Sequence, residues 1–513
     1  MPTAKFAVWE PPTPDQLQLA IDHLHEEIDR LRSRIARLEE EVRAERHQNF
    51  VLSGKVRELE ARLAKNSTNS SLPPSTDPPA AKKTKSLRQQ SDRKIGGQPA
   101  HPGTTLKPVA QPDQVLVHRP AQCRGCGESL AESKVIARGS RQVFDLPPVK
   151  LHVVEHQVET KHCAKCGHWT SALFPHGVDA PAQYGPGVRA RAVYLLNYQL
   201  IPYQRASEVM KDLFGCPLSP ATLANIVKEC AEHLIESELE IKDQLRRADL
   251  IHADETGVRV DEKQHWIHVA STEKLTHYGV DGKRGAAAID RIDILPRVRG
   301  TCVHDGWWAY GQYTKADHAL CNAHIVRELN FFIEHEAKQK PWTQEMKDLL
   351  LGIKEEADKV RAAGRKKIAP EKIRHFEQEY DEIISRGLAV NPHLEDPAKG
   401  ILSYEEGDGT AAPQLTKRTP ALNLVLRLRR NKKEVLHFMY DLKVPFTNNQ
   451  AERDLRMAKL QQKISGCFRV PDGARFFCRL RSYISTMRKQ GQEVVAALEK
   501  VFATPMLHQP PRE

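Results

Sequence analysis

The sequence predicts a multidomain protein of mixed α+β and α class, with a long N-terminal helix, a small cysteine-bearing module and a larger α/β core. Three patterns carry this prediction: a seven-residue apolar repeat near the N-terminus, two copies of Cys-x-x-Cys-Gly, and later apolar strands that run into acidic residues. A chain of 513 residues is long enough for roughly three domains.

The composition narrows the class of partner. Lys and Arg number 77 against 66 Asp and Glu, a net charge of +11, and such an excess favours a polyanion, either nucleic acid or an acidic membrane surface. No run of 18 apolar residues occurs, so a membrane-spanning helix is excluded. The N-terminal stretch also lacks the apolar core of a secretion signal, and we expect a cytoplasmic protein.

Residues 10–65 carry apolar side chains at alternating steps of four and three. One seam is Leu17, Leu24, Leu31, Leu38, Glu45, Leu52 and Leu59, and the other is Ile21, Ile28, Ile35, Val42, Asn49, Val56 and Leu63. This period predicts a left-handed coiled coil, and β-branched residues opposite Leu favour a parallel dimer. A helix that packs back on its own chain is the alternative. We prefer a homodimer or higher oligomer because the positions between the seams are almost wholly charged.

A basic linker is expected at 66–114. Residues 82–107 hold seven Lys or Arg against one acid, with almost no core-forming residues. Such a segment is suited to lie along phosphates, although a solvated linker with incidental charge fits nearly as well.

Residues 115–175 are expected to bind a metal ion. Cys123 and Cys126 form one Cys-x-x-Cys-Gly knuckle, and Cys163 and Cys166 form the other. Four thiolates match tetrahedral Zn²⁺ in a structural role. The alternating residues between the knuckles, 142–160, predict two strands of a long hairpin in a zinc ribbon.

Residues 180–246 have helical periodicity. Ser219 is expected to cap a helix that has Pro220 at its first position. The helix, turn and helix here could read DNA, but an ordinary helical hairpin is the more frequent meaning of such a pattern.

The core is expected at 247–332 and 441–500. Asp254 and Asp305 each follow an apolar strand, and Glu452 falls in the first turn of a helix that Asn448 or Asn449 can cap. Strands followed by helices, with acids at two strand ends, fit a ribonuclease-H-like core in which carboxylates hold two Mg²⁺. Competing acids remain: Glu255 for the first position, and Asp290, Asp293 and Asp317 for the second.

The chain resembles transposases of the IS66 family of bacterial insertion sequences, which use DDE chemistry. The resemblance rests on co-occurring motifs: Lys65-Asn-Ser-Thr-Asn-Ser-Ser, Arg93-Lys-Ile-Gly-Gly-Gln-Pro, the paired knuckles, Ala253-Asp254-Glu255-Thr256-Gly257, His304-Asp305-Gly306-Trp307, Cys321-Asn-Ala-His324, Asn448-Asn449-x-Ala451-Glu452-Arg453 and Lys463-Ile-Ser-Gly466. Two departures are Thr447, where the family often has Asp, and the Lys463 block, where it often has Arg-Lys-Asn.

The resemblance implies that Asp254, Asp305 and Glu452 form the DDE triad and ligate Mg²⁺ or Mn²⁺. It also implies that the protein binds the ends of its element and target DNA near the bacterial nucleoid, with possible accessory proteins. The expected DNA-binding residues are Arg453, Arg456, Lys459, Lys463, Arg469 and Arg475. Arg479, Arg481 and Arg488 extend the same basic face, for which a merely solubilising role is the alternative.

Residues 333–440 are expected to form a helical insertion, with a loop at 388–416. Cys321 and His324 flank the start of a helix, and packing or substrate positioning suits them better than a second metal site. Two rival functions stay open: a ribonuclease-H-like nuclease that cuts without joining, and a zinc-containing DNA-binding protein without catalysis.

Overall fold

The computed structural model describes residues 11, 13–66, 69, 106–146, 149–396, 400–405, 414–416 and 418–503. The chain divides into two compact units: Met1–Thr84, His324–Gly352 and Arg374–Arg430 in the first, and Lys85–Ala323, Ile353–Ile373 and Asn431–Glu513 in the second. Most of the expected basic linker, and both linker motifs of the family resemblance, lie outside the described residues except at their edges. Among the described helices, none is long and apolar enough to cross a membrane.

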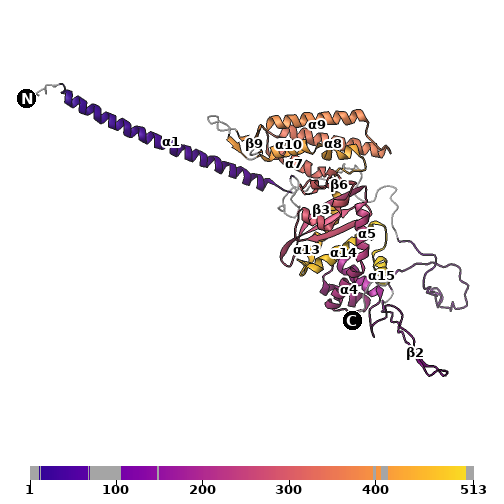
Figure 1. Cartoon of the computed structure of the whole chain (residues 1–513). Coiled ribbons are helices and arrows are strands. Elements are labelled where there is room, and N and C mark those ends of the chain that lie inside the picture. Colours follow the sequence, from indigo (N-terminus) through magenta and orange to yellow (C-terminus); the bar gives the residue numbers. More distant parts are fainter. Residues whose placement is uncertain are drawn as a thin grey trace, which may run out of the picture. The chain divides into compact units, whose positions relative to one another are not determined.

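The N-terminal segment is one uninterrupted helix, α1 (Pro14–Ala64), as Figure 1 shows. Thr13 and Gln16 begin it with a reciprocal capping box, because each side chain accepts the other's backbone N–H. The apolar seam residues are 43–86% exposed, so the described chain does not cover the seam. The predicted long helix is therefore confirmed, and its apolar face stays open to another chain.

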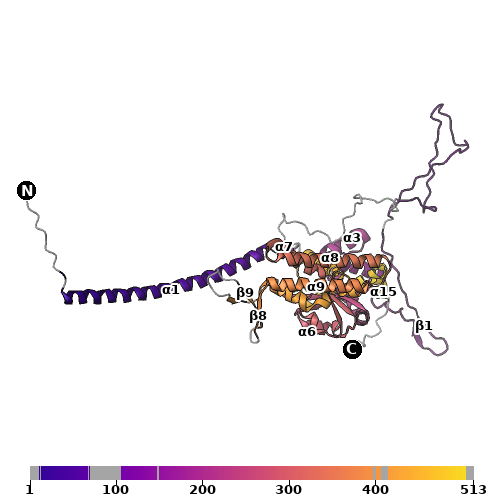
Figure 2. The same cartoon turned by 90° about the horizontal axis from the view of Figure 1, so that it is seen from above.

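Helices α7 (Asn322–His335), α8 (Lys340–Ala362), α9 (Pro370–Val390) and α10 (Pro420–Arg430) follow the core strands, with α8 and α9 side by side in both views (Figures 1 and 2). In the first unit, Gly387 lets α9 approach closely. A Cβ there would lie 2.8 Å from Val425 and 3.2 Å from the buried Trp342 ring. The predicted helical segment is present.

The prediction of a loop over 388–416 was wrong. Strands β8 (His393–Asp396), β9 (Gly400–Glu405) and β10 (Gln414–Thr416) pair there as an antiparallel sheet in the order β10-β9-β8. The Gly, Pro and acidic residues that indicated a loop lie largely between these short strands, outside the described residues.

A mixed five-stranded sheet is the centre of the second unit. It contains β3 (Leu250–Val260), β4 (Lys263–Ser271), β5 (Thr276–Asp281), β6 (Thr301–His304) and β7 (Asp317–Leu320), in the order β5-β4-β3-β6-β7. The first three strands are antiparallel neighbours, whereas β6 runs parallel to β3, and β7 runs parallel to β6.

The two faces of this sheet bury different partners. Because side chains alternate along a strand, Ile251 and Ala253 of β3 face a cluster with α5 (Ile235–Arg246) and α6 (Ala286–Ile292). Val258 and Val260 face the opposite cluster, with α13 (Asn449–Ser465) and α14 (Pro471–Lys489). Even-numbered residues of β3 therefore point toward α13.

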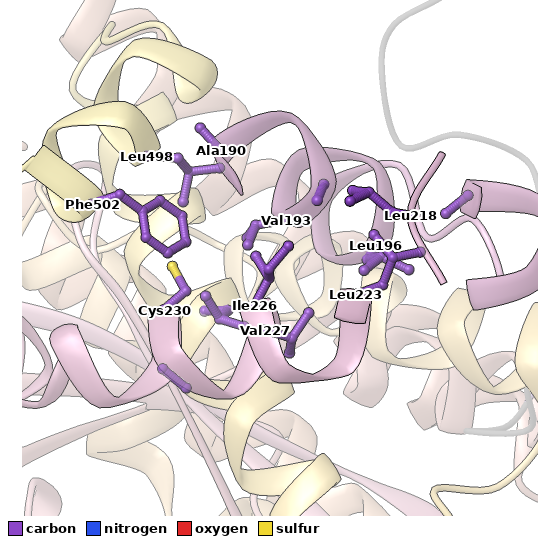
Figure 3. Close-up of a cluster of buried hydrophobic side chains, with 14 of the residues drawn as sticks. Ala190, Val193, Leu196, Leu218, Leu223, Ile226, Val227, Cys230, Leu498 and Phe502 are labelled. Atoms are coloured by element: carbon purple, nitrogen blue, oxygen red, sulfur yellow. The ribbon is translucent and has the colours of Figure 1, made fainter. Parts of the chain in front are cut away.

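A helical cluster combines four elements that precede the sheet in the chain with the last described helix. It consists of α2 (Pro186–Val193), a π-helix at Tyr194–Tyr198, α3 (Tyr203–Phe214), α4 (Pro220–His233) and the C-terminal α15 (Val494–Ala503). Figure 3 shows Leu498 and Phe502 meeting Ala190 and Cys230 in its interior. Ser219 caps α4, accepting the N–H of Thr222, as predicted. The buried face of α4 thus packs in an ordinary helical core.

Candidate active site

Parallel pairing brings the first two acids of the predicted triad together. The register pairs Ile251 with Cys302 and His252 with Val303, a constant offset of 51 residues. Carried two residues further, the same offset places Asp254 beside Asp305, with both side chains on the α13 face. Gly306 follows with φ +88°, a left-handed conformation that lets the chain turn away from β6 directly after Asp305.

Glu255 points to the other face and is already engaged. Its side chain is 1% exposed, Arg284 donates from Nε and Nη2 to Oε1 over 2.8 and 2.6 Å, and the Tyr310 hydroxyl donates to Oε2. Because both carboxylate oxygens have partners, Glu255 serves as a buried structural anion. Of the two competing residues, Asp254 is the one available to a ligand.

Asp254 lies in a strongly anionic environment. Burial raises its pKa well above the usual range, and the negative charges of Glu255, Asp305 and Glu452 raise the pKa further, against one opposing bond from the Glu255 N–H. These charges can act on Asp254 only from nearby. The three predicted acids therefore share one electrostatic site.

The third acid, Glu452, is positioned through Asn448, whose role sequence reasoning missed. Asn448 is the N-cap residue of α13, but its side chain makes no cap hydrogen bond. Its Nδ2 donates to the Ala253 carbonyl over 2.8 Å, and its Oδ1 accepts from His252 Nδ1 over 2.9 Å. Its backbone N–H also contacts Cys321 Sγ at 3.1 Å. The start of α13 is thereby fastened beside Asp254.

Glu452 Oε1 is buried without a hydrogen-bond partner among the described residues. A Cys321 Sγ also lies within 4.8 Å of a Glu452 carboxylate oxygen. Because buried polar atoms are usually satisfied in folded proteins, an orphaned carboxylate oxygen whose charge acts on Asp254 fits a cation ligand. Among the described residues, the carboxylate oxygens of Asp254, Asp305 and Glu452 do not all lie within 4.8 Å of one another. The donors are hard oxygens of the kind that Mg²⁺ prefers.

The acids that competed for the second position have structural partners instead. Asp293 pairs with Arg246 and Arg297, Asp290 accepts from the Tyr313 hydroxyl, and Asp317 lies 3.5 Å from Lys433. None of the three is among the main causes of the raised pKa of Asp254.

Basic residues of α13 extend away from Glu452. Arg456, Lys459 and Lys463 follow it at positions i+4, i+7 and i+11, so they share its face. Arg453, Arg456, Lys459 and Lys463 are exposed, as are Arg469 and Arg475. Lys459 Nζ also donates to the Gly257 carbonyl of β3 over 2.8 Å, which holds this row of cations beside the sheet.

Two of the arginines assigned to the basic face by sequence do not lie on it. Arg481 is 5% exposed, donates to the Asn197 carbonyl and lies over the Tyr198 ring. Arg479 is bonded to Glu238 and to the Ala231 carbonyl. Their spacing on α14 points them into the core, which net charge alone could not reveal, whereas Arg488 is exposed.

The two cysteine knuckles adopt the same local geometry. In each, the backbone carbonyl of the first Cys accepts the N–H of the knuckle glycine, and the glycines have positive φ angles, +79° at Gly127 and +71° at Gly167. Backbone N–H groups of Cys126 and Gly125 lower the pKa of the Cys123 thiol, and those of Cys166 and Lys165 lower the pKa of Cys163. Such knuckles favour the thiolate, the form that binds zinc.

The strands of this module differ from the prediction. The short strands β1 (Thr160–His162) and β2 (Trp169–Ser171) flank the second knuckle, and a bridge between Gln122 and Ser129 flanks the first with the same spacing. The predicted hairpin within 142–160 was wrong, because the described residues between the knuckles form no strand before Thr160. The two thiols of each knuckle belong to one turn, but the four thiols of the two knuckles are not gathered into one cluster.

Comparison with known families identifies the class. Residues 181–476 match the model of the transposase IS66 family, and residues 120–167 match the zinc-finger binding domain of transposase IS66. Residues 10–107 match a family of unknown function, and no curated protein matches the chain. The protein is thus a transposase-type, nucleic-acid-modifying protein with a zinc-finger domain. It belongs to the transposase IS66 family, as the motifs had indicated.

Proposed function

We propose that the protein is a DNA transposase that binds the ends of its element and catalyses metal-dependent strand cleavage and strand transfer. The observation that carries this proposal is the buried Glu452 Oε1, which has no hydrogen-bond partner among the described residues, in a carboxylate whose charge acts on Asp254 together with that of Asp305. The strand order β5-β4-β3-β6-β7, antiparallel and then parallel, supports a ribonuclease-H-like core.

Asp254, Asp305 and Glu452 would hold Mg²⁺ or Mn²⁺. A pair of such ions supplies an activated water or hydroxyl oxygen and stabilises the departing one in phosphoryl transfer. The backbone of the chain orients two of these acids, because Asp254 Oδ1 accepts the Glu255 N–H and Asp305 Oδ1 accepts the Trp307 N–H, at 2.8 and 2.9 Å. One oxygen of each aspartate is thus fixed in place.

The basic row on α13 offers a path for the DNA backbone. Arg456, Lys459 and Lys463 continue from Glu452 along one helix face, so a strand bound across them would have its phosphates led to the acids. Arg453, Arg469 and Arg475 add exposed positive charge in the same part of the chain. We propose these six residues as the DNA-binding set.

The remaining modules have supporting roles in this proposal. Zn²⁺ held by Cys123, Cys126, Cys163 and Cys166 would join the two knuckles into one structural site. The apolar seam of α1 would pair two copies in a homodimer or larger assembly, as two element ends require. The reaction would take place on bacterial DNA in the cytoplasm, and accessory proteins of the element could take part in it.

The triad is tested with Asp305→Asn and Asp305→Ala in the full-length protein. With Mg²⁺ and DNA ends of the element, we expect at least a thousandfold loss of cleavage with DNA binding retained. Asp317→Asn is the matched control, because Asp317 is an exposed acid of the neighbouring strand. Unchanged cleavage in the Asp305 variants would favour a DNA-binding protein without these catalytic acids.

Strand transfer is tested separately with pre-cleaved ends. Joining of a free 3′ hydroxyl to target DNA is expected from the wild type. Cleavage without joining would instead indicate a nuclease.

A further inference from the structure

Trp308 is the most exposed large hydrophobic side chain described between residues 180 and 503, with 68% of its surface accessible. It follows Asp305 by three residues. Its neighbours are packed: Ala309 and Tyr310 are buried, and Trp307 packs against the apolar cluster on the Glu255 face. Trp308 is therefore the one strongly exposed side chain among these packed neighbours.

The turn is fastened at several points. The Trp307 N–H donates to Asp305 Oδ1 over 2.9 Å, the Gly306 N–H to His304 Nδ1 over 3.1 Å, and the Tyr310 N–H to the Trp307 carbonyl over 3.2 Å. The Arg284 guanidinium lies 4.3 Å from the Trp307 ring centroid and 4.8 Å from that of Trp266. Trp307 is thus the anchor, and Trp308 is the ring presented to solvent.

We propose that Trp308 stacks on a nucleobase of the DNA strand whose phosphate is presented to the acids. This inference rests on the proposed function and specifies a contact within it. An indole offers a flat apolar face that any base can cover, whatever its identity. The exposed cations of α13 supply the complementary charge for the backbone of the same strand. A base at this position would lie next to the site of cleavage because Asp305 and Trp308 share one short turn.

The test measures binding without cleavage. A single-stranded oligonucleotide with one 2-aminopurine is titrated with the full-length protein in EDTA, and both fluorescence and affinity are recorded. We expect wild-type protein to quench the 2-aminopurine, and Trp308→Ala to abolish the quenching and weaken binding roughly tenfold. Leu213→Ala, at a side chain 62% exposed, is the matched control and should behave as wild type.

Two further variants separate stacking from packing. Trp308→Phe keeps an aromatic face and should retain most of the quenching, whereas Trp308→Leu keeps apolar bulk and should lose it. If Leu restores quenching as well as Phe, or if Trp308→Ala quenches normally, the stacking role is overturned. A changed mass in sedimentation with unchanged DNA binding would also overturn it and would place Trp308 in a protein interface. Failure of Mg²⁺-dependent cleavage would count against the proposed function alone, because this readout needs no cleavage.

Discussion

Asn448 and Ala253 are joined by a buried hydrogen bond, in which Nδ2 of the asparagine donates to the alanine carbonyl over 2.8 Å. They are 195 residues apart in the chain, yet each lies close in sequence to a proposed catalytic acid. This bond sets the position of the Glu452 helix against the Asp254 strand.

Asn448→Ala should therefore weaken both stability and catalysis. Loss of a buried donor that serves Ala253 and of the acceptor that serves His252 should cost about 1–3 kcal/mol of unfolding free energy, measured in urea. Metal-dependent cleavage should fall further than the loss of folded protein explains. The exposed neighbour Asn449 supplies the control, Asn449→Ala, and equal behaviour of the two variants would contradict the assignment.

The basic residues of the C-terminal region should separate into two groups. Arg469→Ala, at an exposed position, should leave stability unchanged, weaken DNA binding and lower the salt dependence by about one phosphate contact. Arg481→Met should instead lower the unfolding free energy by about 1–3 kcal/mol, because the Asn197 carbonyl loses its buried donor. DNA titrations over a salt series, with urea unfolding of both variants, measure the difference. If Arg481→Met weakened DNA binding without loss of stability, Arg481 would belong to the basic face after all.

The seam of α1 should control the mass of the protein. Leu31→Lys places a charge in the seam and should shift the full-length protein from dimer to monomer in sedimentation equilibrium. Ser33→Lys adds the same charge two residues away, outside both seams, and should leave the mass unchanged. A wild-type protein that is monomeric at high concentration would refute the coiled-coil dimer.

The two knuckles should hold one zinc ion between them. Purified protein should contain about one zinc per chain, and Cys163→Ser should lose it, since a structural site needs all four thiolates. Cys467→Ser, which alters another exposed thiol, should keep the metal in elemental analysis. Full zinc content in Cys163→Ser would exclude the shared site.

Acid should weaken the protein through Glu238. Burial raises its pKa, but bonds and charges from His277 and Arg479 outweigh this effect and lower the pKa to about 2 from 4.5. Stability from Glu238 is then complete above pH 4.5 and is lost as the pH falls toward 2, by on the order of 3 kcal/mol. Urea unfolding of Glu238→Gln should show a flatter pH dependence over that interval. An equally steep loss in the variant would contradict this role.

The elements that could be predicted from the sequence are those whose signal is local. The heptad pattern predicted α1, the Ser219-Pro220 pair predicted the start of α4, and the knuckles predicted two equivalent turns. Asp254 and Asp305 could be picked out as candidate acids in the sequence because each is a polar residue that directly follows a predicted apolar strand. Asp254 was expected at a strand end, yet β3 continues to Val260, because it pairs with β4 along its whole far half and Val260 also bridges Phe468.

Long-range partners account for what the sequence could not provide. Asn448 looked like a helix cap, and its actual partners on β3 lie nearly two hundred residues earlier. Likewise, Arg481 has the same local appearance as Arg488, and only the packing of α14 distinguishes them. The three strands in 388–416 had no alternating pattern strong enough to outweigh their turn-forming composition.

The parallel partner of β3 ends beside Asp254, but β3 itself goes on. From that point on, three carbonyls of β3 each accept one hydrogen bond from a different residue. Ala253 accepts from the Asn448 side chain, Gly257 from the Lys459 side chain and Arg259 from the Phe468 N–H. On this side, the far half of β3 is therefore hydrogen-bonded to two side chains and to the Phe468 backbone rather than to a neighbouring strand of the sheet. A longer β6 would occupy the side of β3 that Asn448 and Lys459 now contact, so the shortness of this one strand leaves space for the helix that carries Glu452.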